Sequence, residues 1–197
     1  MSTAPIDRHP LGLPAGSVRA LLALAITITF WVHLVVPTTS VPMYLYFMLV
    51  LVPVFFASSG QSTDAGPRFN PLYLPGWLIR LLIVAGSVAV LVWQFITSPD
   101  LLARLRPDPA EIKDWPYYFL ALVGGCTVGW LIGRGPWRKS SAFQDVQAWI
   151  SMLAMLAFAA EIVIDLVIKP QTQLLADRHI WHAILIGVMG FYFASRS

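Results

Sequence analysis

The sequence predicts an all-α fold, a polytopic integral membrane bundle of about six transmembrane helices, from three observations. Hydrophobic residues make up 57% of the 197 positions, and charged residues make up only 12%. The mean hydropathy of +0.70 lies well outside the range typical of soluble domains. Apolar runs close to the ~20 residues that cross a hydrocarbon layer recur along the whole chain.

Six apolar runs mark the predicted spans in chain order. The sixth is short for a span, so five spans and a partial sixth are the alternative arrangement. The predicted organisation has a cytoplasmic segment over residues 1–19, one transmembrane domain over 20–194 and a tail over 195–197. The spans are predicted near residues 20–36, 41–57, 78–97, 117–133, 147–168 and 180–194.

Two local features modify this series of spans. Pro53 lies inside the second span, where a missing N–H and a bulky ring predict a kink. Between the third and fourth spans, Leu101, Leu102 and Leu105 alternate with Arg104 and Arg106. This pattern predicts a short amphipathic helix at the outer membrane surface.

The distribution of basic residues predicts the orientation of the chain. With six spans, the side that holds the N-terminus collects eight of the 13 Lys and Arg residues, and short basic loops favour the cytoplasm. We therefore expect both termini in the cytoplasm and the protein in a bacterial cytoplasmic membrane. The eight are Arg8, Arg19, Arg68, Arg80, Arg134, Arg138, Lys139 and Arg196.

Three basic residues are predicted to anchor spans at the membrane interfaces. Arg19 and Arg80 each follow a Leu-Pro pair by the same spacing, in LPAGSVRALL (13–22) and LPGWLIRLLI (74–83). Both can extend to lipid phosphates, as can Lys169 on the other side. The repeated pattern indicates either a duplicated two-span hairpin or a residue pattern that any helix entering the membrane from the cytoplasm favours.

Small residues mark candidate packing faces. Gly125, Gly129 and Gly133 are spaced four apart in the fourth span, so they share one helix face, and Gly187 provides a weaker version in the sixth. Small residues let two helix backbones approach closely inside a membrane. The partner is either another helix of this chain or a second subunit.

Polar groups inside the spans form the candidate site. Glu161, Asp165 and Lys169 are spaced four apart on one helix face, and Asp165 is close enough to pair with Lys169. Glu161 lies deeper and needs another partner, because an unpaired charge inside the membrane has a high free-energy cost. His33 and His182 are the candidates, and the four residues Glu161, Asp165, His33 and His182 could form a proton or cation site.

Two classes of function are consistent with these features. The first is a non-catalytic accessory subunit of a larger membrane complex, whose partners are other integral membrane subunits and lipids. The second is a small proton- or cation-coupled transporter or channel that uses Glu161. A haem or other tetrapyrrole on His33 or His182 is a further alternative. We expect no enzyme activity, no resident metal site and no nucleic-acid partner.

Overall fold

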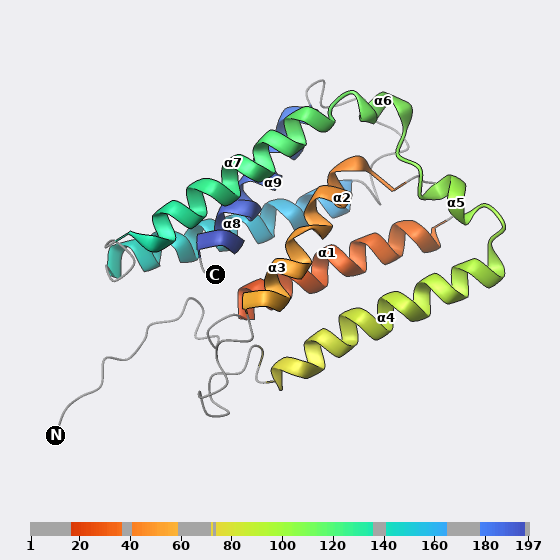
Figure 1. The fold of residues 1–197 in the computed structure, drawn as a ribbon, viewed down its shortest axis with the longest axis horizontal. Coiled ribbons are helices and arrows are strands. Elements are labelled where there is room, and N and C mark those ends of the chain that lie inside the picture. The colour runs from red at the N-terminus through yellow and green to blue at the C-terminus, as the bar shows by residue number, and fades with distance from the viewer. Residues whose placement is uncertain are drawn as a thin grey trace.

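The computed structural model describes residues 17–36, 41–58, 72, 74–135, 141–164 and 178–195. Every element in these ranges is a helix, and they contain no strand. The long helices lie side by side as a bundle, with two short helices at one end (Figure 1). The prediction of an all-α fold is confirmed for these ranges.

Helix α1 (Ser17–Val35) lies at the centre of the bundle and contacts α2, α3, α4 and α8. Its buried side chains are mostly apolar and include Leu22, Ile26 and Leu34. The Thr27 and Thr29 hydroxyls donate to carbonyls one turn earlier in the same helix, at 2.8 and 2.7 Å. These bonds satisfy both hydroxyls without a partner from another helix.

The second predicted span is a broken helix, α2 (Met43–Leu49) followed by α3 (Leu51–Ser58). The break at Val50 precedes Pro53. Proline has no N–H to donate to the carbonyl of Leu49, four residues earlier, and its ring crowds that carbonyl. The sequence therefore predicted a distortion correctly, and the structure places it one turn before the proline.

Helix α4 (Gly76–Thr97) lies at one edge of the bundle, alongside α1 (Figure 1). The indole N–H of Trp31 donates to the Ser87 hydroxyl at 3.1 Å. A Cβ at Gly86 would collide with the Trp31 ring. A side chain at position 86 would therefore require the Trp31 ring to move.

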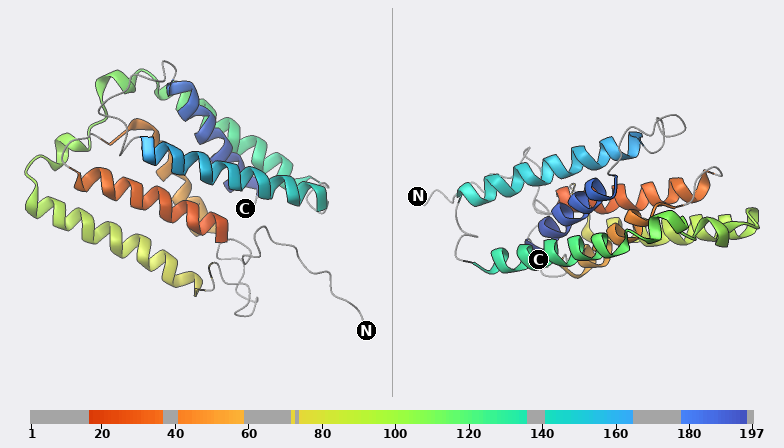
Figure 2. Two further views of the ribbon diagram at one scale, coloured as in Figure 1. Left: turned by 180° about the vertical axis from the view of Figure 1, so that it is seen from behind. Right: turned by 90° about the horizontal axis from the view of Figure 1, so that it is seen from above.

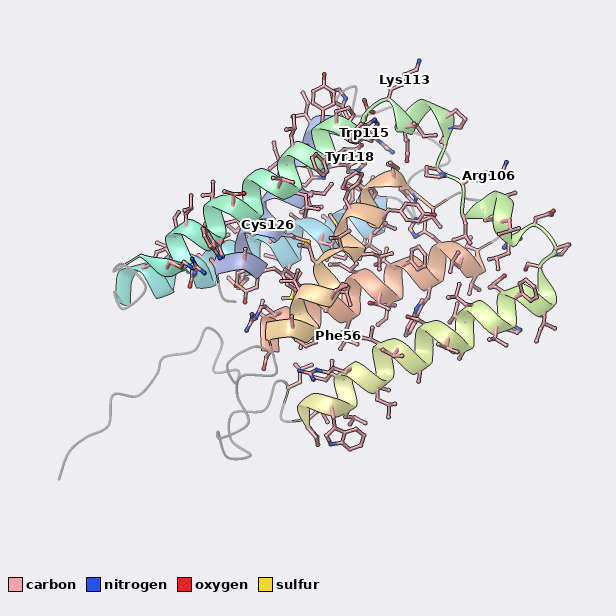
Figure 3. The ribbon with its side chains drawn as sticks, viewed as in Figure 1. Phe56, Arg106, Lys113, Trp115, Tyr118 and Cys126 are labelled. Carbon is pink, nitrogen blue, oxygen red and sulfur yellow. The ribbon has the colours of Figure 1, made fainter. Side chains whose placement is uncertain are left out.

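Two short helices, α5 (Leu101–Arg104) and α6 (Pro109–Ile112), connect α4 to α7. Leu101 is buried, whereas Leu102 is exposed, as an amphipathic segment requires. The Arg104 Nη1 group donates to the carbonyl of Leu34 at the end of α1, at 3.2 Å. Arg106 and Lys113 project away from the bundle at this end (Figure 3).

Helices α7 (Trp115–Arg134), α8 (Ser141–Val163) and α9 (Arg178–Ser195) complete the bundle. Helix α9 lies between α7 and α8 and contacts both (Figure 2). The core between α9 and the helices packed around it contains large buried side chains. They include Leu45, Met48, Phe158, Ile186, Met189 and Phe193.

Among the residues that the structure describes, three helices are long and apolar enough to cross a membrane: Ser17–Val35, Trp77–Thr97 and Trp115–Arg134. Met43–Ala57 and Trp149–Val163 are apolar but shorter. The finding supports membrane association, but it does not confirm six spans. Within the described residues each predicted span overlaps a helix, and residues 165–168 of the fifth span lie outside them. Helix α8 begins at Ser141, earlier than the predicted start at 147, because its first turns are too polar for a hydropathy scan.

Candidate functional site

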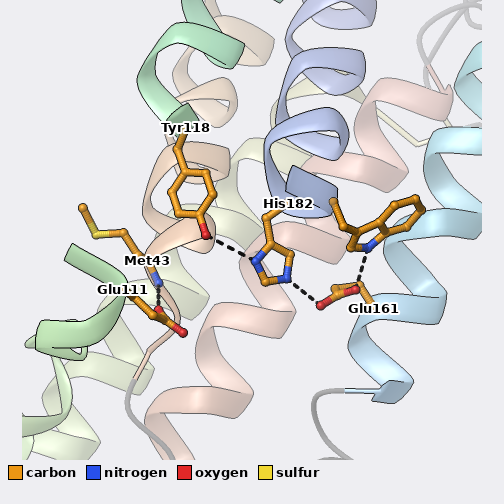
Figure 4. Close-up of polar contacts among 6 residues, drawn as sticks. Met43, Glu111, Tyr118, Glu161 and His182 are labelled. Atoms are coloured by element: carbon orange, nitrogen blue, oxygen red, sulfur yellow. Dashed lines mark hydrogen bonds and ion pairs between the residues drawn. The ribbon is translucent and has the colours of Figure 1, made fainter. Parts of the chain in front are cut away.

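Glu161 and His182 form a buried pair where the end of α8 meets the start of α9 (Figure 4). The Glu161 Oε1 and His182 Nε2 atoms lie 2.7 Å apart, within hydrogen-bond and ion-pair distance. Only 2% of Glu161 and 5% of His182 is exposed. Of the two histidines predicted as partners of Glu161, the structure brings His182 to it.

The second carboxylate oxygen of Glu161 also has a donor. The indole N–H of Trp181 donates to Glu161 Oε2 at 2.7 Å. Trp181 and His182 are consecutive residues of α9, so the first turn of that helix supplies a donor to each carboxylate oxygen. Two donors compensate much of the cost of burying a carboxylate.

The other ring nitrogen of His182 faces α7. The Tyr118 hydroxyl lies 3.5 Å from His182 Nδ1, a long hydrogen bond (Figure 4). Tyr118 is 2% exposed and lies about one turn after the start of α7. A phenol hydroxyl can donate or accept, so Tyr118 can match either protonation state of the imidazole.

An aromatic ring covers one face of the imidazole. The rings of Tyr44 and His182 are stacked, with centroids 4.2 Å apart and planes inclined by 25°. Tyr44 lies in the first turn of α2 and is 1% exposed. Four helices, α2, α7, α8 and α9, therefore meet at His182. We call Glu161, His182, Tyr118, Tyr44 and Trp181 the polar cluster.

Sequence reasoning did not single out Tyr44, Tyr118 or Trp181 as site residues. Aromatic residues near the ends of apolar runs are usually assigned to the membrane interface, where their polar atoms contact water and headgroups. Here the hydroxyl of Tyr118 and the indole N–H of Trp181 point to groups inside the protein instead. Only the packing of α7 and α9 distinguishes the two cases.

The remaining candidate residues do not join the polar cluster in the described ranges. His33 is buried in α1, and its Nδ1 atom lies 2.9 Å from the Thr29 carbonyl oxygen, which accepts its proton. No hydrogen bond or ring contact between described residues joins His33 to His182. Asp165 and Lys169 lie outside the residues that the structure describes, as does the pairing predicted between them.

The predicted anchors Arg19 and Arg80 lie near the starts of α1 and α4. Both side chains are partly buried. This position corresponds to the membrane interface if both helices cross the membrane from the same side.

The glycine face of α7 packs directly against the backbone of α9. A Cβ at Gly125 would overlap the carbonyl of Gly187, and one at Gly129 would overlap the carbonyl of Phe191. At Gly133 it would lie 2.9 Å from the Ser195 carbonyl oxygen. These glycines therefore serve contact between two helices of this chain, one of the two alternatives that the spacing left open.

The hydrogen-bond partners of His182 suit either protonation state of its ring. With neutral His182, Nε2–H donates to Glu161 and Nδ1 can accept from the Tyr118 hydroxyl. With protonated His182, Nε2–H still donates to Glu161 and Nδ1–H donates to the Tyr118 oxygen. Within the described ranges, no three His, Cys, Asp or Glu residues lie close enough together to hold a metal ion.

Both ring nitrogens of His182 are thus occupied by protein groups, an arrangement that disfavours this residue as an axial ligand of a tetrapyrrole. For His33 the tetrapyrrole interpretation stays a prediction. The chemistry that the geometry supports is proton exchange at an imidazole held between a carboxylate and a phenol.

Comparison of this chain with known protein families, with curated proteins and with solved structures found no match.

Proposed function

We propose that this chain is a six-span protein of the bacterial cytoplasmic membrane that moves protons across the membrane by binding and releasing them at the polar cluster. In this proposal both termini lie in the cytoplasm, because the loops on that side would carry most of the Lys and Arg residues. The cluster would then lie near the outer face, since α5 and α6 would be in an outer loop.

One observation carries the proposal: both ring nitrogens of buried His182 have partners that suit two protonation states. In the proton-bound state, the His182 imidazolium pairs with the Glu161 carboxylate at 2.7 Å. In the proton-free state, the neutral His182 imidazole keeps the same contact with Glu161. Imidazole is the side chain that ordinarily gains or loses a proton near neutral pH, so modest changes in its surroundings can change its protonation state.

The occupied carboxylate favours a proton over a metal cation as the transported ion. Each Glu161 oxygen already accepts an N–H bond, from Trp181 or from His182. A metal ion on Glu161 would have to displace or crowd these donors. A proton at His182 Nδ1 needs no displacement, because the Tyr118 oxygen faces that atom.

Proton flux in liposomes tests this function. The purified chain is reconstituted with a pH-sensitive dye inside the vesicles, and an outward potassium gradient with valinomycin supplies the driving potential. We expect the wild-type chain to acidify the interior faster than protein-free vesicles do. The variant Glu161→Gln, which lacks the charge that stabilises the imidazolium, should lose most of this flux.

Asp100→Asn is the matched control, because it also neutralises a carboxylate but at an exposed position before α5, with no side-chain capping bond to that helix. Asp100→Asn should retain the wild-type flux. Equal flux in Glu161→Gln and the wild-type chain would contradict the proposal, as would an absence of flux above that of protein-free vesicles.

An accessory subunit of a membrane complex is the second candidate, and the surface of α4 favours it. This helix lies at one edge of the bundle and packs mainly on α1 (Figures 1 and 2). It exposes apolar side chains along its length. Lipid or a partner helix can cover these side chains. Its exposed residues include Leu81, Leu82, Val84, Val88, Val92, Phe95 and Ile96.

Purification in native nanodiscs, followed by mass spectrometry, tests this second candidate. A partner chain in fixed stoichiometry, lost in a Val88→Arg variant, would support it. A particle that contains only this chain and that conducts protons when reconstituted would contradict it.

A further inference from the structure

The first turn of α2 connects the polar cluster to the segment that contains α5 and α6. On one side of this turn, the Tyr44 ring stacks on His182 at 4.2 Å. On the other side, the Met43 N–H donates to Glu111 Oε2 at 2.7 Å, and the Tyr46 hydroxyl donates to the Leu105 carbonyl at 2.7 Å. We call residues 98–114 the strap.

Glu111 supplies a hydrogen bond that α2 cannot provide for itself. The first N–H groups of a helix have no acceptor within it, and a side chain at the residue before the helix usually supplies one. In α2 that residue is Pro42, which makes no such bond. The acceptor comes instead from Glu111 in α6, a residue far away in the sequence (Figure 4).

The strap makes further bonds to the same end of the bundle. The Val41 N–H, just before α2, donates to the Arg104 carbonyl at 3.2 Å. The Arg104 side chain donates to the Leu34 carbonyl at the end of α1, at 3.2 Å. Among these contacts, only the Glu111 bond joins a charged side chain to the first turn of α2.

We propose that Glu111 is a positioning residue for the proton site: by holding the first turn of α2, it keeps Tyr44 against His182 and shields the imidazole from water. The inference rests on the proposed function for its biological meaning. The physical link has three steps: from Glu111 to the Met43 N–H, from Met43 to the next residue, Tyr44, and from the Tyr44 ring to His182.

The Tyr44 ring contributes in two ways when it stacks on His182. It removes one face of the imidazole from solvent, and its electron-rich face attracts the imidazolium. The titratable groups that face His182 are then Glu161 from α8, Tyr118 from α7 and Tyr44 from α2. Loss of Tyr44 from this position would open the site on the α2 side.

Chemical modification of the histidines with diethyl pyrocarbonate tests the inference. The reagent acylates accessible imidazole nitrogens, and mass spectrometry of peptides gives a rate for each histidine. In Glu111→Ala we expect His182 to react roughly tenfold faster or more, because a helix turn held by a charge-assisted hydrogen bond becomes free to open. Glu111→Gln, which keeps an acceptor oxygen, should restore most of the protection.

Two other histidines provide internal references in the same measurement. His33 is buried in α1 and would react faster only if the whole bundle loosened. His179 is partly exposed in the first turn of α9 and should keep its rate. An unchanged His182 rate in Glu111→Ala would overturn the inference, and so would a parallel increase at His33.

Tyr44→Leu is the second variant, for the case that Glu111→Ala does not fold. It removes the stacked ring but keeps the backbone N–H of Met43, so His182 should again become reactive while His33 stays protected. Protection that persists in Tyr44→Leu would overturn the role given to the ring. The modification rates do not depend on flux, so a failure of the proposed transport function would leave this test valid.

Discussion

A carboxylate buried among membrane helices needs donors within hydrogen-bond distance, and Glu161 has one on each oxygen. The Trp181 and His182 donors both lie at 2.7 Å. Burying an ionised group costs several kcal/mol even after the surroundings relax, so the pair persists only with this geometry. At the residue scale, the first turn of α9 therefore supplies the hydrogen-bond donors that the buried Glu161 side chain needs.

Removal of one donor should weaken the fold measurably. Trp181→Phe keeps an aromatic ring, although a smaller one, and removes the indole N–H. We expect the free energy of unfolding to fall by about 1.5–3 kcal/mol, the range for hydrogen bonds to charged groups. Thermal unfolding in detergent, followed by circular dichroism, measures the change. Trp149→Phe at a 62% exposed position of α8 is the control and should change stability by less than about 0.5 kcal/mol.

The hydroxyl of Tyr118 should affect proton flux more than stability. Tyr118→Phe keeps the ring and removes a hydrogen bond that is long at 3.5 Å, so we expect a loss of about 1 kcal/mol or less. The flux in liposomes should fall several-fold, because His182 Nδ1 loses the group that faces it. Tyr117→Phe, at a 57% exposed neighbour, should retain the flux. The opposite ranking of the two variants would argue against Tyr118 as part of the proton site.

At the scale of elements, the packing of α7 on α9 holds the polar cluster together. Helix α7 carries Tyr118 and α9 carries His182, so their separation sets the distance between the two side chains. The glycine face brings the two backbones to a distance at which no Cβ fits at Gly125 or Gly129. The same close contact that packs the helices therefore also positions the site.

Two adjacent glycines of α7 should respond in opposite ways to the same substitution. Gly125→Ala places a methyl group against the Gly187 carbonyl, and we expect a loss of about 1–3 kcal/mol, as for other overpacked sites. A Cβ at Gly124 meets nothing within 4 Å. Gly124→Ala should therefore leave stability unchanged or raise it by up to about 1 kcal/mol, through better helix propensity. Equal unfolding temperatures for the two variants would show that the α7–α9 contact is looser than described.

For the whole molecule, the main question is how the bundle crosses the membrane. In the described part of the chain, three helices meet the length and hydropathy expected of a span, and the other helices there are shorter or more polar. A six-span arrangement requires the broken helix α2–α3, and also α8 and α9, to cross as well. Burial against α1 and against one another would let these shorter or more polar helices lie at membrane depth with part of their surface away from lipid.

Cysteine labelling tests the proposed topology. In a Cys126→Ala background, Trp77→Cys and Asp100→Cys place single thiols at the two ends of α4. We expect a membrane-impermeant maleimide to label position 100 in intact cells or spheroplasts, and position 77 only after permeabilisation. Labelling of both positions from one side would contradict a span at α4, and the reverse pattern would contradict the proposed orientation.

Much of the local structure could be predicted from sequence because its causes are local. Apolar runs predicted the positions of α1, α4, α7 and α9, since hydropathy along a single helix decides whether it can lie in lipid. Pro53 predicted a distortion of the second span through its missing N–H. Glu161 was identified as a residue that needs a partner because a carboxylate in an apolar run carries the same cost in any fold.

The sequence by itself thus determined the class of this protein, the approximate helices and the residue on which the candidate site depends. Only the tertiary structure decided that His182 rather than His33 contacts Glu161, and that Tyr44 and Tyr118 complete the cluster. It also decided that the glycine face of α7 packs on α9 of the same chain. The physical reason is that periodicity and hydropathy describe single helices, whereas these contacts join helices that are far apart in the chain. The relative rotation and depth of those helices depend on all the packing surfaces together.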